Sequence, residues 1–200
     1  DKVYQNLLKE RIIKNGVIFI NPQTTRLSYD TKIKKGAIIE SNVIFNKGVT
    51  INNNVKIKSY TVLEGCKIDY NSTVGPSARI RPLTVIGKNS KVGNYVEIKN
   101  SKIGNNSSIS HLSYIGDSVL GNNVNIGAGT ITCNYDGIKK NKTIIENDVF
   151  VGSNCSLVAP IKIGSNSTIG AGSVITRNIP SNYLAIERNK IKILRKPGKK

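Results

Sequence analysis

Residues 27–63 have the sequence LSYDTKIKKGAIIESNVIFNKGVTINNNVKIKSYTVL, in which a large apolar side chain recurs at every sixth position. This period differs from the 3.6 residues of an α-helix and from the two residues of an ordinary strand. Each six-residue unit is therefore expected to form a short strand followed by a corner, with the apolar side chain pointing inward. The recurring residues are Leu27, Ile33, Ile39, Phe45, Ile51, Ile57 and Leu63.

The same period continues, with a few shortened units, as far as Ile175. Glycine follows many of the apolar residues, and glycine and asparagine accept corner backbone angles that bulkier residues avoid. Three sides close one triangular coil, and successive coils stack like parallel strands. We therefore predict an all-β chain whose main domain, residues 17–180, is a parallel β-helix. Residues 132–143 interrupt the repeat and are expected to form an inserted loop, a common place for functional residues.

Two segments flank the predicted β-helix. Within residues 1–16, Val3, Leu7, Leu8 and Ile12 recur at helical spacing, and Gly16 is well placed to end a helix. A helical linker is therefore expected over about residues 2–15. Residues 181–200 are rich in Lys and Arg and are interpreted as a basic C-terminal tail.

The composition restricts the class of protein. Apolar residues make up 38% of the chain and aromatic residues 6%, a thin supply for a conventional globular core. No apolar run is long enough to cross a bilayer, so a soluble, cytoplasmic protein without a membrane span is expected. Cys66, Cys133 and Cys155 form no CxxC pair, so neither disulfides nor a zinc site are predicted, and all three are interpreted as reduced and structural.

The formal net charge of +18 suggests an anionic partner. Three interpretations are open: lysines that decorate solvated turns, attraction of a small phosphorylated anion, or binding of a nucleic acid. Few aromatic residues interleave with the basic ones, and no known nucleic-acid motif is present. Nucleic-acid binding therefore ranks last, and no nucleic-acid partner is predicted.

His111 is the only histidine, so any proton transfer by an imidazole must use it. It lies in the segment ISHLSY, residues 109–114, where Ile109 and Ser113 are expected to face inward. This pattern places His111 near a corner and within reach of solvent. A lone histidine is more often structural than catalytic, so the surrounding sequence must decide between the two roles.

Residues 122–137, NNVNIGAGTITCNYDG, contain more than a generic repeat requires. Together with RIRP at 79–82, VEIK at 96–99 and HLSYIGD at 111–117, this stretch closely resembles the C-terminal acetyltransferase domain of the bacterial bifunctional enzymes that acetylate glucosamine 1-phosphate and then uridylylate the product. These hexapeptide-repeat acyltransferases act in UDP-N-acetylglucosamine biosynthesis, which supplies peptidoglycan of the cell wall. The resemblance implies a left-handed coil and a homotrimer with sites between subunits. The glycine-rich nucleotide-binding signature of the uridyltransferase half is missing from the chain.

The resemblance also implies roles for individual residues. His111 would be the catalytic base, with no metal required, and acetyl-CoA the co-substrate that donates the acetyl group. Arg81 and Lys99 suit the phosphate of the substrate, and Tyr114 and Asn125 suit its sugar hydroxyls. Taken singly, Arg81 and Lys99 are equally explained as solvated charges. The residues implied in binding acetyl-CoA are Ala128, Asn134, Tyr135, Lys140, Ser153, Ala171 and Arg188.

The implied reaction is direct acyl transfer. His111 would remove a proton from the substrate amine, whose nitrogen attacks the thioester, while backbone N–H groups or Ser153 stabilise the developing charge. Cys133 is a less favoured nucleophile, because no histidine is shown beside it. Two other functions stay open: another hexapeptide-repeat acyltransferase with a different acceptor, and a non-catalytic β-helix that serves as an assembly module.

Overall fold

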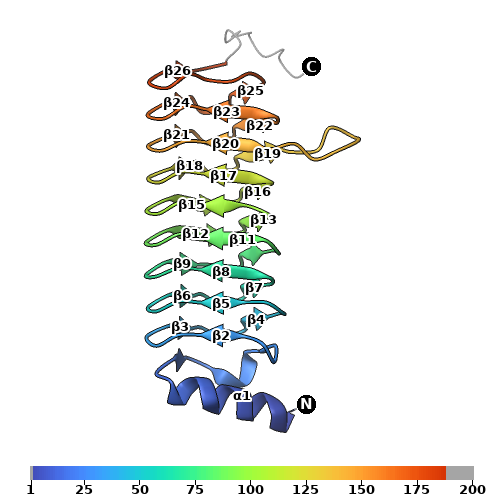
Figure 1. Cartoon of the computed structure of the whole chain (residues 1–200), viewed down its shortest axis with the longest axis vertical. Coiled ribbons are helices and arrows are strands. Elements are labelled where there is room, and N and C mark those ends of the chain that lie inside the picture. Colours follow the sequence, from blue (N-terminus) through green and yellow to red (C-terminus); the bar gives the residue numbers. More distant parts are fainter. Residues whose placement is uncertain (1, 188–200) are drawn as a thin grey trace, which may run out of the picture.

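A computed structural model describes residues 2–187, which form a three-sided prism of parallel β-strands (Figure 1). Each side of the prism is one sheet, and we name the sheets A, B and C. Each inward apolar residue of the six-residue repeat lies near the end of one short strand. The repeat therefore predicts the parallel β-helix correctly.

Sheet A contains β1 (Ile18–Phe19), β3 (Ile38–Ile39), β6 (Lys56–Ile57), β9 (Thr73–Val74), β12 (Lys91–Asn94), β15 (Ser108–His111), β18 (Asn125–Ile126), β21 (Phe150–Val151), β24 (Thr168–Ile169) and β26 (Leu184–Ala185). Sheet B contains β4 (Ile44–Phe45), β7 (Val62–Leu63), β10 (Arg79–Ile80), β13 (Glu97–Lys99), β16 (Tyr114–Gly116), β19 (Ile131–Cys133), β22 (Ser156–Val158) and β25 (Val174–Ile175). Sheet C contains β2 (Lys32–Ile33), β5 (Thr50–Ile51), β8 (Cys66–Ile68), β11 (Thr84–Ile86), β14 (Lys102–Ile103), β17 (Ser118–Leu120), β20 (Thr143–Ile145) and β23 (Ile161–Ile163).

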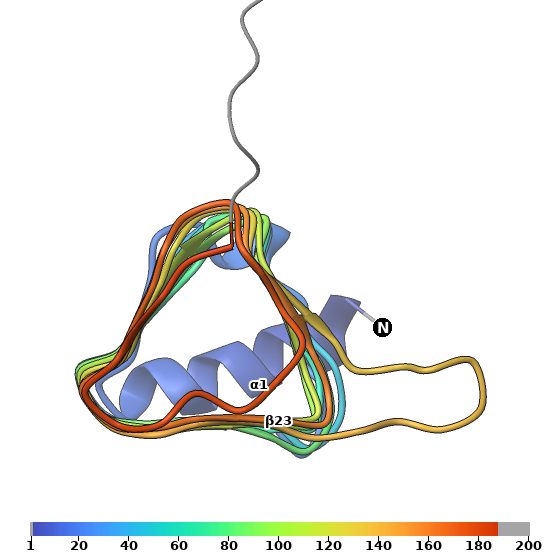
Figure 2. The ribbon, with the colours of Figure 1, turned by 90° about the horizontal axis from the view of Figure 1, so that it is seen from above.

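The coil is left-handed. Successive strands β3, β4, β5 and β6 belong to sheets A, B, C and A, so one turn of the chain visits each sheet once. Followed from the N-terminal end toward the C-terminal end, the turns run left-handed, as the side view and the view along the axis show together (Figures 1 and 2). The hand that the family resemblance implied is therefore confirmed, although the spacing alone does not determine it.

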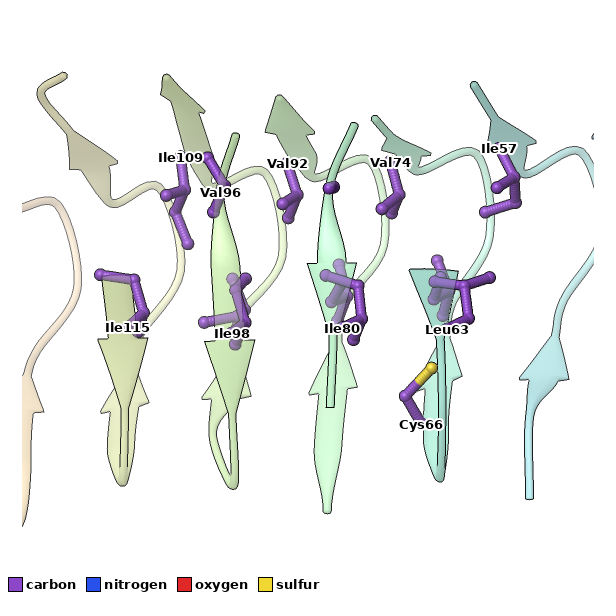
Figure 3. Packing of buried hydrophobic residues seen from close by; sticks show 14 of the residues in the cluster. Ile57, Leu63, Cys66, Val74, Ile80, Val92, Val96, Ile98, Ile109 and Ile115 are labelled. Carbon is purple, nitrogen blue, oxygen red and sulfur yellow. The ribbon is translucent and has the colours of Figure 1, made fainter. Parts of the chain in front are cut away.

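The core is a narrow column of aliphatic side chains, one from nearly every strand. Figure 3 shows these side chains stacked in rows, one along sheet A and one along sheet B. Burying one such side chain contributes about 1.5–3 kcal/mol, which explains how a chain poor in aromatic residues forms a stable core. Residues of the rows that are almost completely buried include Val74, Val92 and Ile109 of sheet A and Ile80, Ile98 and Ile115 of sheet B.

Helix α1 (Lys2–Lys14) covers the N-terminal end of the prism (Figure 1). Leu8 and Ile12 are buried against the first coil, and the side-chain amide of Gln5 bonds both backbone groups of Leu27, at 2.8 and 3.0 Å. The helix ends before Gly16, whose φ of +83° suits glycine. A short 3₁₀ helix, Pro22–Thr24, follows β1. No helix among the described residues combines the length and the apolar character needed to cross a membrane.

Two boundaries differ from the sequence-based expectation. The interruption is shorter than residues 132–143, because Cys133 pairs with Val158 in sheet B and Thr143 pairs with Ser118 in sheet C. The excursion is therefore residues 134–142. The coil also continues past residue 180, since Ala185 takes the position in sheet A that Ile169 holds one coil earlier. Because an alanine stands where the preceding coil has an isoleucine, the repeat of large apolar residues does not reveal this last strand.

Candidate functional site

His111 lies at the corner where sheet A passes into sheet B, as the sequence predicts, and its side chain is exposed. The backbone of the same corner is hydrogen-bonded from coil to coil. The His111 carbonyl accepts from Gly129, the Ala128 carbonyl from Asn154, and the Ser153 carbonyl from Gly172. Consecutive coils therefore stack a column of residues at this edge, which we name the A/B column: Asn94, His111, Ala128, Ser153 and Ala171.

The A/B column is flanked on the sheet A side by glycines at which successive coils approach closely. A Cβ added to Gly127 would lie 2.5 Å from the backbone of Gly152, and one added to Gly152 would lie 2.5 Å from the backbone of Ala171. Only glycine fits these positions. The small side chains of Ala128, Ser153 and Ala171 form a ridge along this edge, which suits a long, thin ligand that lies along the prism axis.

Arg81 and Lys99 lie at the opposite edge of sheet B, where it passes into sheet C. Arg81 directly follows β10 and Lys99 ends β13, and these strands are adjacent because Ile80 pairs with Ile98. Arg81 Nη1 is 2.8 Å from Glu97 Oε1, and both side chains are about one third exposed. This ion pair orients the guanidinium without removing it from solvent.

Tyr114 and Asn134 converge on the backbone of Gly116, which pairs with Lys99. A Cβ added to Gly116 would lie 2.5 Å from Tyr114 Oη and 2.7 Å from Asn134 Nδ2. The side-chain amide of Asn134 donates to Asp117 Oδ2 and is buried. The glycine therefore makes room for a phenol and an amide beside the two cationic side chains.

Lys140 joins this group from the excursion at residues 134–142, which we name the arm. The nearby side chain of Lys140 lowers the pKa of Lys99, partial loss of water contact and the charge of Arg81 act in the same direction, and the Asp117 carboxylate opposes them. Like charges are held together only where something else fixes their positions. We name Arg81, Lys99 and Lys140 the B/C cluster, a place suited to an anion.

The arm projects from the corner between sheets B and C (Figure 2). Asp136 fixes its turn, because one carboxylate oxygen accepts from the backbone N–H groups of Ile138 and Lys139, at 2.9 and 2.8 Å, and the other accepts from Asn141. These bonds lower the pKa of Asp136 to about 2. Tyr135, exposed on the arm, donates its hydroxyl to the Gly137 carbonyl at 2.7 Å.

The structure thus divides the predicted site residues between two edges of one prism. His111, Ala128, Ser153 and Ala171 lie at the A/B corner. Arg81, Lys99, Tyr114, Asn134, Tyr135 and Lys140 lie on sheet B or at the B/C corner. Asn125 faces outward from β18 in sheet A, and Arg188 lies outside the described residues.

Sequence reasoning missed two residues beside the site, Asn94 and Asp117. Asn94 precedes His111 by one 17-residue coil, so the coil length, once known, would have found it. Asp117 holds the amides of Asn100 and Asn134, a contact that no sequence pattern marks. Cys133 lies at the end of β19, across sheet B from His111, so no imidazole accompanies it in the same prism.

Two descriptions of known protein families match parts of the chain. The description "Bacterial transferase hexapeptide (six repeats)" matches residues 30–65 and 142–177, and "GMPPB C-terminal domain" matches residues 68–157. Over these residues the chain is similar to hexapeptide-repeat transferases.

The chain is similar to two bacterial proteins named bifunctional protein GlmU. The protein from Zymomonas mobilis is 46% identical over 189 residues, which cover 94% of this chain and 42% of the relative. The protein from Thermodesulfovibrio yellowstonii is 46% identical over 202 residues, which cover 90% of this chain and 45% of the relative. The chain spans less than half the length of these relatives. The resemblance to the C-terminal acetyltransferase domain of the bifunctional enzymes is confirmed.

Solved hexapeptide-repeat structures share the fold. LpxA from Acinetobacter baumannii superposes with a TM-score of 0.72 at 18% identity, over 86% of this chain and 71% of that one. The UDP-N-acetylglucosamine acyltransferase of Francisella novicida superposes with a TM-score of 0.68 at 18% identity, over 84% of this chain and 66% of that one. At these identities the comparison supports the left-handed β-helix and nothing about the substrate.

Proposed function

We propose that this protein transfers an acetyl group from acetyl-CoA to the amine of glucosamine 1-phosphate. The observation that carries the proposal is the A/B column, in which Ala128, Ser153 and Ala171 follow His111 on successive coils. Three of the residues that the resemblance implies in binding acetyl-CoA therefore form one continuous line that ends at the proposed base. Such a line suits a pantetheine chain whose thioester end lies at His111.

The B/C cluster supports a phosphorylated acceptor. Three cationic side chains meet there, and a phosphate group would relieve the repulsion between Lys99 and Lys140. Tyr114 Oη and the Asn134 amide lie beside the cluster, where they can bond sugar hydroxyls or the acetyl carbonyl.

The division of the residues between two corners supports a site built from two chains. We propose a homotrimer in which sheet A and the A/B column of one protomer face sheet B and the B/C cluster of its neighbour. Exposed Tyr60, Tyr95 and Leu112 also line the A/B corner, each with a positive φ that costs about 1–2 kcal/mol for a residue other than glycine. Large apolar side chains held in this conformation at a solvent edge are explained by contact with another copy.

The proposed step forms a C–N bond and breaks a C–S bond. His111 accepts the proton that the sugar nitrogen loses, the nitrogen attacks the thioester carbonyl, and coenzyme A leaves as a thiolate that then takes a proton. Ser153 lies two coils from His111, roughly 10 Å along the axis at the usual spacing of parallel strands. We therefore propose that Ser153 contacts the pantetheine chain rather than the reacting carbonyl.

A thiol-release assay with acetyl-CoA and glucosamine 1-phosphate tests the proposal. We expect turnover with this acceptor and little with glucosamine, which lacks the phosphate. A folded protein that releases no thiol would contradict the proposed function. Turnover with another amine alone would favour a different hexapeptide-repeat acyltransferase.

The His111→Ala variant separates an enzyme from an assembly module. Since His111 is exposed, we expect its loss to leave the melting temperature unchanged and to lower kcat by about 10²–10⁴-fold, the usual contribution of a general base. Unchanged turnover would show that the imidazole takes no part in the reaction.

A further inference from the structure

The side chain of His111 hydrogen bonds that of Asn94, a residue to which the family resemblance gives no role. Its Nδ1 lies 2.6 Å from Oδ1 of Asn94, which occupies the same corner one coil earlier. Because the carbonyl oxygen of an amide only accepts, the ring must donate from Nδ1. The neutral ring then carries its proton on Nδ1, and the lone pair of Nε2 is free.

The backbone makes this contact specific to one level of the prism. Among the described strands, only β12 and β15 extend over four residues, and they reach the corner at Asn94 and His111. Strands β9, β18, β21 and β24 of the same sheet end two residues earlier in the repeat. The extended pairing brings Asn94 and His111 into register on the same face.

We propose that Asn94 is a positioning residue that fixes the tautomer and orientation of His111, so that Nε2 faces the substrate amine. The inference rests on the proposed acetyltransferase function. An asparagine performs this task without a charge of its own, so its hydrogen bond persists over the whole working pH range. Asn94 acts through the imidazole and needs no contact with the substrate.

The charged groups that line the cavity beside Asn94 and His111 are cationic. Asn94 and His111 line a cavity of about 420 Å³ together with Lys56, Lys58 and Lys91, and no carboxylate belongs to its described lining. A carboxylate introduced at position 94 would therefore be the first negative charge beside the ring, which makes Asn94→Asp an informative variant.

The single histidine permits a direct test that does not depend on activity. Ring ¹⁵N chemical shifts, measured above the pH at which the imidazolium titrates, report which nitrogen is protonated. We expect the Nδ1–H form in the unchanged protein and a shift toward the Nε2–H form, which free histidine prefers, in Asn94→Ala. A ring protonated on Nε2 in the unchanged protein, or the same tautomer in both proteins, would overturn the proposal.

Kinetics then test the link to catalysis. Asn94→Ala is expected to lower kcat by about 10- to 100-fold with little change in KM, part of the about 10²–10⁴-fold that a general base supplies. Asn94→Asp is expected to restore most of this loss and to raise the pH midpoint of kcat, because a carboxylate stabilises the imidazolium. An Asn94→Asp variant as slow as Asn94→Ala, with an unmoved pH midpoint, would reject the positioning role.

Asn52→Ala is the matched control. Asn52 also joins neighbouring coils through its side chain, which donates to Asp69 Oδ1 at 2.7 Å, but it lies in sheet C away from His111. We expect it to reduce stability and leave kcat and the His111 shifts unchanged. If the unchanged protein shows the Nδ1–H ring but no turnover, the proposed function fails while the Asn94 contact stands.

Discussion

Lys99 differs from an ordinary surface lysine because it lies beside two other cationic side chains. The side chain of Lys140 lowers its pKa, so part of the Lys99 population loses its charge at a pH where other lysines keep theirs. Because folding favours the neutral form of Lys99, the charged form destabilises the folded state at pH values below the lowered pKa. This destabilisation disappears as the pH rises through the lowered pKa toward the ordinary pKa of lysine. An anion bound between the two lysines would restore the charged form.

Binding of the sugar phosphate should therefore weaken as the pH rises through the lowered pKa of Lys99. Lys140→Ala is expected to move this loss toward higher pH, since the principal cause of the shift is removed. At neutral pH the same variant should raise KM for the sugar phosphate about 10-fold, the effect of one lost charge-assisted hydrogen bond.

The pH dependence of KM for glucosamine 1-phosphate measures both effects. Lys139→Ala is the control, because Lys139 is the neighbouring exposed lysine of the arm. If Lys140→Ala gave the same KM and the same pH dependence as Lys139→Ala, the proposed role of the B/C cluster in phosphate binding would be contradicted.

Among the elements, the arm is an excursion stabilised mainly from within. The Asp136 carboxylate closes its turn, and the Asn141 N–H donates to the Asn134 carbonyl at 2.7 Å to close its base. The depressed pKa of Asp136 means that its contribution is present above the carboxylate's unfolded pKa and is lost as the pH falls toward about 2.

Asp136→Ala should loosen the arm without affecting the prism. We expect faster amide hydrogen exchange at Ile138 and Lys139, which lose their acceptor, and an unchanged melting temperature. Because Lys140 lies on the arm, KM for the sugar phosphate should rise as well. Exchange that stays slow at both amides would show that other contacts hold the turn.

Strands β12 and β15 approach so closely that position 93 admits only glycine. A Cβ on Gly93 would overlap the carbonyl oxygen of Ser110, which is backbone and cannot move aside cheaply. Gly93→Ala should therefore lower the free energy of unfolding by about 1–3 kcal/mol, as overpacked sites do, and displace Asn94 and His111.

Chemical denaturation and kcat measure the Gly93→Ala effect. Gly137→Ala serves as its control, because a Cβ there meets nothing within 4 Å and the strain that its φ of +96° imposes on an alanine falls on the arm rather than on the prism. Equal stability losses in the two variants would contradict the steric argument.

The sequence predicts the strands and corners better than it predicts which side chains of different coils lie against one another. The six-residue period predicts the inward position of Ile109 and Ser113, and from them the exposed corner at His111. It does not predict that Asn94 lies against His111, because that requires the coil length, which varies where a unit is shortened. Lys140 is placed beside Lys99 by the turn at Asp136, a local bond pattern without a period.

At the scale of the whole molecule, the A/B column and the B/C cluster lie on opposite edges of sheet B. A rigid prism cannot bring these edges together, so the proposed reaction needs a neighbouring copy. The family resemblance implies the same arrangement, and the structure supports it through the separation of His111 from Lys99.

Mixed assemblies of two inactive variants test this arrangement. When His111→Ala and Lys99→Ala chains are coexpressed in equal amounts, about a quarter of the sites between two chains should combine an intact His111 with an intact Lys99. We expect that fraction of the activity to return. Coexpression of either variant with itself is the control, and no recovery in the mixture would place both residues of each site in one chain.

The arm also bears on how a prism of this kind can change in length. Cys133 and Thr143 keep their partners in sheets B and C on either side of the arm, so the intervening residues leave and return without shifting the register of any strand. A residue added within a strand would instead turn every following side chain to the wrong face. Extra sequence can therefore be accommodated at a corner. A longer or shorter arm would change which residues contact the proposed neighbouring copy, while the prism itself stays the same.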